Sequence, residues 1–88
     1  MDRRQLFSRL ARGALNNVSF NDLVDLVQGF GFRLVRISGS HHIFAHQDIA
    51  ELINLQSVRG QAKPYQIRHL LRLVERYNLR LEELEEEE

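Results

Sequence analysis

The fold of this chain is decided by the stretch Arg36-Ile37-Ser38-Gly39-Ser40-His41-His42-Ile43-Phe44. An apolar alternation breaks there at a small turn, and two histidines follow directly. Residues 32–37 have the β-branched and aromatic content of a half-buried strand, and residues 41–44 resume as a second strand. Gly39 gives the connection access to positive φ at no steric cost, so a tight hairpin is predicted. Because neighbouring strand residues point to opposite faces, a core Phe44 puts His41 outside.

Two amphipathic helices are predicted on either side of this hairpin. The first begins at Ser19, an N-cap residue, and its apolar stripe comprises Phe20, Leu23, Val24, Val27 and Phe30. The second begins at Pro64, and its stripe comprises Ile67, Leu70, Leu71, Val74 and Tyr77. Asn78 can end this helix, and residues 52–55 predict a third strand. The expected fold is an α+β two-layer domain of order α-β-β-β-α, with both helices on one face of an antiparallel sheet.

We expect one domain over residues 1–81, with its core at residues 19–79. Residues 3–15 predict an extra N-terminal amphipathic helix, which either packs on the domain edge or acts as a basic arm along an RNA backbone. Residues 82–88 form an acidic tail. This tail is either a solvated segment or one that folds back on the basic surface.

Composition narrows the possible functions. The 88 residues include no cysteine, which excludes disulfides, thiolate zinc sites and cysteine nucleophiles. There is neither a signal peptide nor an apolar run near the ~18 residues of a membrane span, so a cytoplasmic protein is expected. The net charge is zero, but six of the twelve acidic residues lie in the last seven positions. The remaining body is basic and its cations are almost all arginine, which favours a polyanionic partner.

The four histidines do not predict a metal site. His41 and His42 are neighbours on a strand and point apart, His46 is expected in a loop, and His69 lies on a distant helix. Because these ligands do not converge, we expect neither a metal nor another cofactor.

His41 is the candidate catalytic residue. Metal-free RNA cleavage needs a group that takes the 2′-hydroxyl proton, a proton donor for the leaving 5′-oxygen, and cations for the developing charge. An imidazole can carry out either proton transfer near neutral pH. No second proton carrier is evident. The alternative for His41 is a surface residue that forms hydrogen bonds, and for His42 we expect a half-buried structural role.

Several residues around the hairpin are candidates for RNA contact. The Ser40 hydroxyl and the backbone amides of Gly39 and Ser40 would lie near the phosphate, and Arg36 or Lys63 would stabilise its charge. Singly these cations are ordinary solvated charges, but together they flank one hairpin and loop. The RNA-binding set is therefore Arg33, Arg36, Gly39, Ser40, Arg59 and Lys63. Tyr65 is expected either to stack on a base or to pack at the helix start.

An arginine, then Gly39-Ser40-His41 and an aromatic residue three positions on, in a short chain of this topology, resembles the HicA toxin family of bacterial toxin–antitoxin systems. The resemblance runs from about Ser19 to Leu79 and is best at Gly31-Phe32, Gly39-Ser40-His41 and residues 63–66. It implies a double-stranded-RNA-binding-domain-like fold, ribonuclease activity with His41 as the single catalytic histidine, and a cognate HicB-type antitoxin that covers the basic face.

One departure from the family pattern concerns a second histidine. Many members carry it in a Pro-x-His pattern after the third strand, where this chain reads Leu55-Gln56-Ser57-Val58. The role of that second histidine in the family is therefore not assigned to any residue of this chain.

The resemblance, together with the residue chemistry of His41, implies the toxin of a type II toxin–antitoxin system, a metal-independent endoribonuclease that cleaves mRNA through His41. One alternative is a non-catalytic RNA-binding module of the same fold, in which His41 only bonds to phosphate or a 2′-hydroxyl. Another is a protein-interaction domain with an acidic tail, which predicts no salt-dependent RNA binding.

Overall fold

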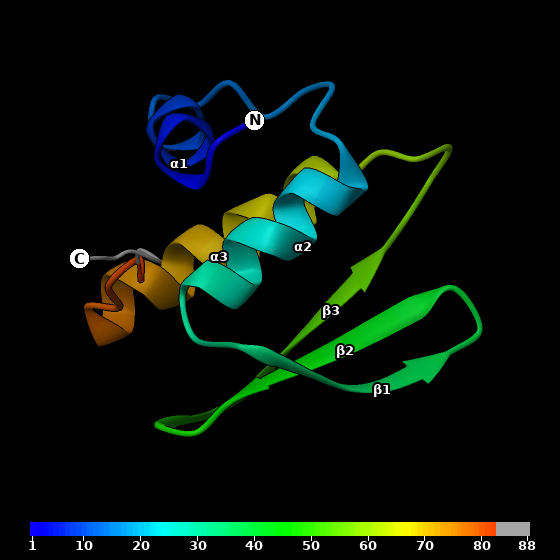
Figure 1. Cartoon of the computed structure of the whole chain (residues 1–88), viewed down its shortest axis with the longest axis vertical. Helices are drawn as coiled ribbons and strands as arrows, with labels where there is room; N and C mark the ends of the chain where they lie inside the picture. The colour runs from blue at the N-terminus through cyan, green and yellow to red at the C-terminus, as the bar shows by residue number, and fades with distance from the viewer. Residues whose placement is uncertain (83–88) are drawn as a thin grey trace.

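The computed structural model describes residues 1–82 of the chain. Its elements are α1 (Arg3–Ala11), α2 (Phe20–Gly29), β1 (Arg33–Ser38), β2 (His41–His46), β3 (Ile49–Gln56) and α3 (Pro64–Tyr77). The strands form an antiparallel sheet in the order β1-β2-β3. Helices α2 and α3 lie side by side on one face of this sheet (Figure 1). This confirms the expected α+β arrangement with an extra N-terminal helix, which is consistent with a double-stranded-RNA-binding-domain-like fold.

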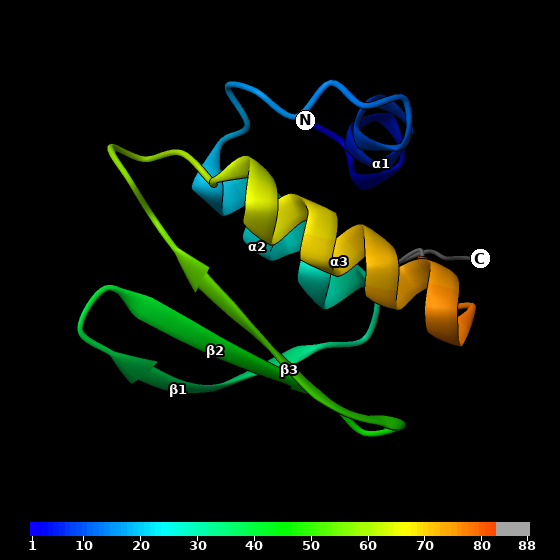
Figure 2. The ribbon, with the colours of Figure 1, turned by 180° about the vertical axis from the view of Figure 1, so that it is seen from behind.

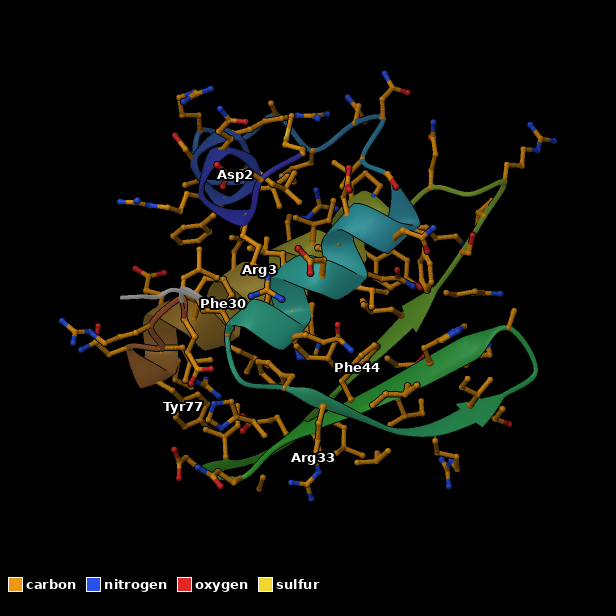
Figure 3. The ribbon with its side chains drawn as sticks, viewed as in Figure 1. Asp2, Arg3, Phe30, Arg33, Phe44 and Tyr77 are labelled. Carbon is orange, nitrogen blue, oxygen red and sulfur yellow. The ribbon has the colours of Figure 1, made fainter. Side chains whose placement is uncertain are left out.

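The hydrophobic core lies between the sheet and these two helices. Phe44, Ile53 and Leu55 project from the sheet and are fully buried, and Figure 3 shows Phe44 between the strands and the helices. The helices contribute Leu23, Leu26, Val27, Ile67 and Leu70, all fully buried. Each such side chain stabilises the fold by about 1.5–3 kcal/mol relative to an exposed one. The opposite face of the sheet carries no helix (Figures 1 and 2), and we call it the open face.

Helix α1 packs against the helical layer on the side remote from the sheet (Figures 1 and 2). Its Leu6 and Leu10 are buried in the core cluster. The ring of Phe7 meets that of Phe30 edge to face, with 5.1 Å between centroids. The helix therefore packs on the domain, which is the first of its two expected roles, but it ends at Ala11 rather than at residue 15. Gly13 has a φ of +93°, a left-handed conformation that stops a helix.

Local signals set the ends of the other helices. The Ser19 hydroxyl accepts a hydrogen bond of 3.3 Å from the backbone N–H of Asp22, which caps α2. Pro64 is the first residue of α3, and Asn78 ends that helix in the left-handed conformation with a φ of +53°. These positions agree with the prediction.

The second hairpin differs from the sequence expectation. His46 is the last residue of β2 and pairs with Ile49, so β3 begins at Ile49 rather than at residue 52. The His46 ring lies edge to face on Phe32, and its Nδ1 accepts a hydrogen bond of 3.1 Å from the N–H of Asp48. These contacts hold a polar segment in strand conformation where composition alone suggested a loop.

The predicted acidic tail lies outside the described residues except for Glu82, whose backbone N–H donates to the carbonyl of Gly29 at 2.7 Å. Among residues 1–82, no helix has the length and apolar character needed to cross a membrane.

Candidate active site

The connection between β1 and β2 is a two-residue turn formed by Gly39 and Ser40. Ser38 and His41, on either side of it, are paired across the sheet. Gly39 has a φ of +61°, and a glycine with positive φ at the first turn position is the requirement of a type II′ hairpin. A Cβ on Gly39 would meet nothing within 4 Å. Backbone conformation, rather than space, therefore requires glycine here.

His41 lies exposed at the first position of β2, as the sequence predicts. Its Nδ1 is 3.0 Å from the side-chain oxygen Oδ1 of Asn54 in β3. His41 itself pairs with Gln56, so Asn54 is its diagonal neighbour across the sheet. Because Ile53 and Leu55 face the core, the alternation of the strand puts Asn54 and Gln56 on the open face with His41.

Ser40 is also held from β3. The side-chain amide of Gln56 donates a hydrogen bond from Nε2 to the Ser40 hydroxyl oxygen at 3.0 Å. The backbone N–H of Gln56 donates in turn to Oε1 of Gln66 at 3.4 Å, and Gln66 is a buried residue of α3. The tip of the hairpin is thus linked through Gln56 to the helical layer.

A β-bulge brings two arginines of β1 to the open face. Arg33 pairs with Ala45 and Arg36 with Ile43, and the register shifts at Val35 between Leu34 and Arg36. In a regular strand, residues three apart point to opposite faces. The extra residue of the bulge changes this alternation, so both arginine side chains point to the same face. Figure 3 shows the Arg33 side chain directed away from the helices. The open face therefore carries Arg33 and Arg36 beside His41.

These two guanidinium groups are available to a ligand. Within residues 1–82, Arg33 and Arg36 form no hydrogen bond or ion pair, and both are exposed. By contrast, Arg3 is paired with Asp25 at 2.9 Å and Arg76 with Glu51 at 3.1 Å. Arg33 and Arg36 therefore leave two uncompensated positive charges on the open face.

Arg59 and Lys63 lie in the segment that follows β3. Arg59 and Gly60 have φ values of +55° and +79° and form a tight turn between the paired residues Val58 and Gln61. Because β3 ends opposite His41, this segment begins at the same end of the sheet as the β1–β2 turn (Figures 1 and 2). The Lys63 ammonium lies 5.9 Å from the centroid of the Tyr65 ring, a cation–π distance.

The other histidines lie away from this site. His42 is half-buried on the helix side, as predicted, with its ring 5.1 Å from that of Phe20 in an edge-to-face contact. Its Nδ1 is buried without a hydrogen-bond partner among the described residues. His69 lines a shallow pocket on α3. Within residues 1–82, no group of three or more histidine or carboxylate side chains could hold a metal ion.

A polar cluster joins β3 to α3 at a distance from the hairpin turn. The Tyr77 hydroxyl, at the end of α3, donates to Glu51 of β3 at 2.6 Å, and Arg76 donates to the same carboxylate. The hydrogen bond from Tyr77 holds the pKa of Glu51 below its usual value, and the same bond raises the pKa of Tyr77. The hydrogen bonds of this cluster connect the sheet to α3, so its role is structural.

Sequence reasoning did not identify Asn54 and Gln56. A strand with buried Ile53 and Leu55 does predict outward-facing polar neighbours. The pairing of these neighbours with Ser40 and His41 depends on the register between β2 and β3, which local sequence does not specify.

The fold and this site define a small α+β protein of the double-stranded-RNA-binding-domain type, with an exposed histidine and unpaired arginines on its open sheet face. A family model described as the HicA toxin of bacterial toxin–antitoxin systems matches residues 20–75, which span α2, the whole sheet and most of α3. The match covers more than half of the chain, so the chain belongs to the HicA toxin family. Membership gives it a toxin role and implies a partner in a toxin–antitoxin system. Comparison with curated proteins and with solved structures gives no match.

Proposed function

We propose that this toxin is a metal-independent endoribonuclease, an mRNA interferase, that acts in the cytoplasm and uses His41 as its catalytic acid/base. One observation supports the proposal above the others: His41 is exposed on the open face while Asn54 occupies its Nδ1. The second ring nitrogen, Nε2, has no hydrogen-bond partner within residues 1–82 and is left to exchange protons with a substrate.

The proposed reaction is attack of the ribose 2′-oxygen on the adjacent phosphorus. His41 takes the 2′-hydroxyl proton, the new P–O2′ bond forms, and the P–O5′ bond breaks. The products are a 2′,3′-cyclic phosphate and a 5′-hydroxyl end, with the 5′-oxygen protonated by water. The Ser40 hydroxyl, the amides of Gly39 and Ser40, and Arg36 face the phosphate whose charge increases in the transition state. Because water is a weak general acid, turnover is expected to be slow.

The cations flanking the hairpin would bind the RNA backbone. Arg33 and Arg36 lie on the open face. Arg59 and Lys63 lie in the segment between β3 and α3, which is bonded to the start of α2 through Gly60 and Ala62. Phosphate contacts of this kind position a nucleic acid without reading its sequence. In the inhibited complex, a HicB-type antitoxin would cover the same basic face and exclude the RNA.

The test is cleavage of a labelled mRNA at low salt in excess EDTA by the parent chain, by His41→Ala and by His69→Ala. The proposal requires that the parent cleaves, that His41→Ala binds RNA without cleaving it, and that His69→Ala, which removes a histidine remote from the site, cleaves as the parent does. Product ends should be a 2′,3′-cyclic phosphate and a 5′-hydroxyl.

Other outcomes of this test would replace the proposal. Salt-sensitive binding without cleavage by any of the three proteins would identify a non-catalytic RNA-binding module. Cleavage abolished by EDTA would identify a metal-dependent enzyme. The absence of salt-dependent binding would leave a protein-interaction domain.

A further inference from the structure

We propose that two amide side chains of β3, Asn54 and Gln56, are positioning residues that decide where the protons of His41 and Ser40 lie. Their expected effect on cleavage rests on the ribonuclease function proposed above. Their effect on the protonation pattern of the resting protein does not depend on that function.

The first step concerns the tautomer of His41. The structure turns Oδ1 of Asn54 toward Nδ1 of His41 at 3.0 Å, and because an amide oxygen only accepts hydrogen bonds, this orientation assigns the proton to Nδ1. In the neutral ring this assigns the hydrogen to Nδ1 and the lone pair to Nε2. A general base needs that lone pair on the side that meets the substrate. The opposite tautomer would present an N–H to the 2′-hydroxyl and could not remove its proton.

The second step concerns the Ser40 hydroxyl. Nε2 of Gln56 donates to the Ser40 oxygen at 3.0 Å, so that oxygen acts as the acceptor in this bond. The hydroxyl hydrogen remains to be donated, and a phosphate oxygen is a strong acceptor for it. Gln56 is well suited to hold this geometry because its backbone N–H is bonded to Gln66 of the helical layer at 3.4 Å.

The third step is that these bonds contribute more to function than to folding. His41, Asn54 and Ser40 are exposed, so water can replace each amide as a partner in the folded protein. The side chains of Asn54 and Gln56 project away from the core. Substitution there should therefore leave the fold intact, and Asn54→Leu retains the branched shape of the side chain.

The first experiment is nitrogen NMR of the His41 ring in uniformly labelled protein, at a pH where the ring is neutral. The parent and Asn54→Asp, whose carboxylate can also accept from Nδ1–H, should show the hydrogen on Nδ1. Asn54→Leu should shift toward the mixture of a free histidine. Leu52→Ala, which alters an exposed residue two positions earlier on β3, should match the parent. A parent ring with its hydrogen on Nε2 would overturn the proposal, whatever the cleavage assay gives.

The second experiment is single-turnover cleavage at saturating RNA, which removes differences in affinity. Asn54→Leu should be slower by about 10- to 100-fold, the range seen when supporting contacts of a catalytic group are lost. Asn54→Asp should recover most of this loss. Gln56→Leu should also be slower, because the Ser40 oxygen loses its hydrogen-bond donor. The His41 tautomer should be unchanged, since this substitution leaves Asn54 and the backbone bond to Gln66 in place.

The two experiments separate failure of this proposal from failure of the proposed function. If the parent cleaves and Asn54→Leu cleaves equally fast, Asn54 has no positioning role. If Gln56→Leu cleaves as fast as the parent, the assignment to Gln56 is wrong. If the parent does not cleave, the proposed ribonuclease function is wrong, while the NMR result still decides whether Asn54 sets the tautomer of His41.

Discussion

Arg33 and Arg36 lie on the same face of the sheet although they are three residues apart on one strand, because Val35 forms a bulge between them. Neither is paired within residues 1–82. Each neutralised phosphate contributes about −0.7 to the slope of log affinity against log salt for a single strand.

The double substitution Arg33→Ala/Arg36→Ala should therefore weaken RNA binding and make that slope shallower by about 1.4, the value for two lost contacts. Fluorescence anisotropy at several salt concentrations measures it. Arg68→Ala/Arg72→Ala removes the same two charges from exposed positions of α3 and serves as the control. An equal effect of this control would mean that the open face is not the preferred RNA surface.

Gly39→Ala should destabilise the protein by about 1–2 kcal/mol, since its positive φ is unfavourable for any residue with a Cβ. Nothing crowds this position, so the cost is conformational. Gly39→Asn should cost less, because asparagine tolerates the left-handed region better. Urea unfolding measures both variants. Equal stability of Gly39→Ala and the parent would show that the turn does not need a left-handed residue.

Tyr77→Phe should make the free energy of unfolding less dependent on pH between neutral and acid conditions. The hydrogen bond from Tyr77 lowers the pKa of Glu51 in the folded state. A carboxyl group with a lowered pKa stabilises the fold above its unfolded pKa, and that stabilisation disappears as pH falls through the folded pKa. The raised pKa of Tyr77 acts in the alkaline range, where its stabilisation is lost as pH rises.

The free energy of unfolding of Tyr77→Phe should accordingly lie below that of the parent near neutral pH, and the two should converge in acid. Urea unfolding at a series of pH values measures this difference. A difference that stays constant from neutral to acid pH would show that the bond to Glu51 is not its source.

Leu10→Ala should cost about 2–5 kcal/mol of stability, the range for truncating a buried leucine. Leu10 belongs to α1, which lies outside the region that matches the family model, yet it is buried in the core cluster. Thermal or urea unfolding gives the value. A cost below 1 kcal/mol would show that α1 is an appendage to the core rather than part of it.

The sequence predicted the elements whose signals are local. Ser19, Pro64 and Asn78 set helix ends through their own backbone and side-chain chemistry. Gly39 set the hairpin and thereby the position of His41. The end of α1 was missed although Gly13 carried a local signal for it, because the apolar spacing continues through Ala14.

Features that depend on pairing between strands were not predictable in the same way. No residue type in the sequence indicates the bulge at Val35, and this bulge decides on which face of the sheet Arg33 lies. The partnership of His41 with Asn54 depends on the register between β2 and β3. His46 was placed in a loop because its support comes from the ring of Phe32, a contact across the fold.

The two ends of the described chain converge on Gly29 at the end of α2. A Cβ on Gly29 would lie 2.8 Å from Leu81 and 2.9 Å from Arg3, and Glu82 donates to the Gly29 carbonyl. This junction belongs to the helical side of the molecule, opposite the open face (Figures 1 and 2). A purification tag or a fluorescent reporter joined before Met1 would therefore be attached behind the site. Such a fusion should allow the toxin to be immobilised or imaged while its open face stays accessible.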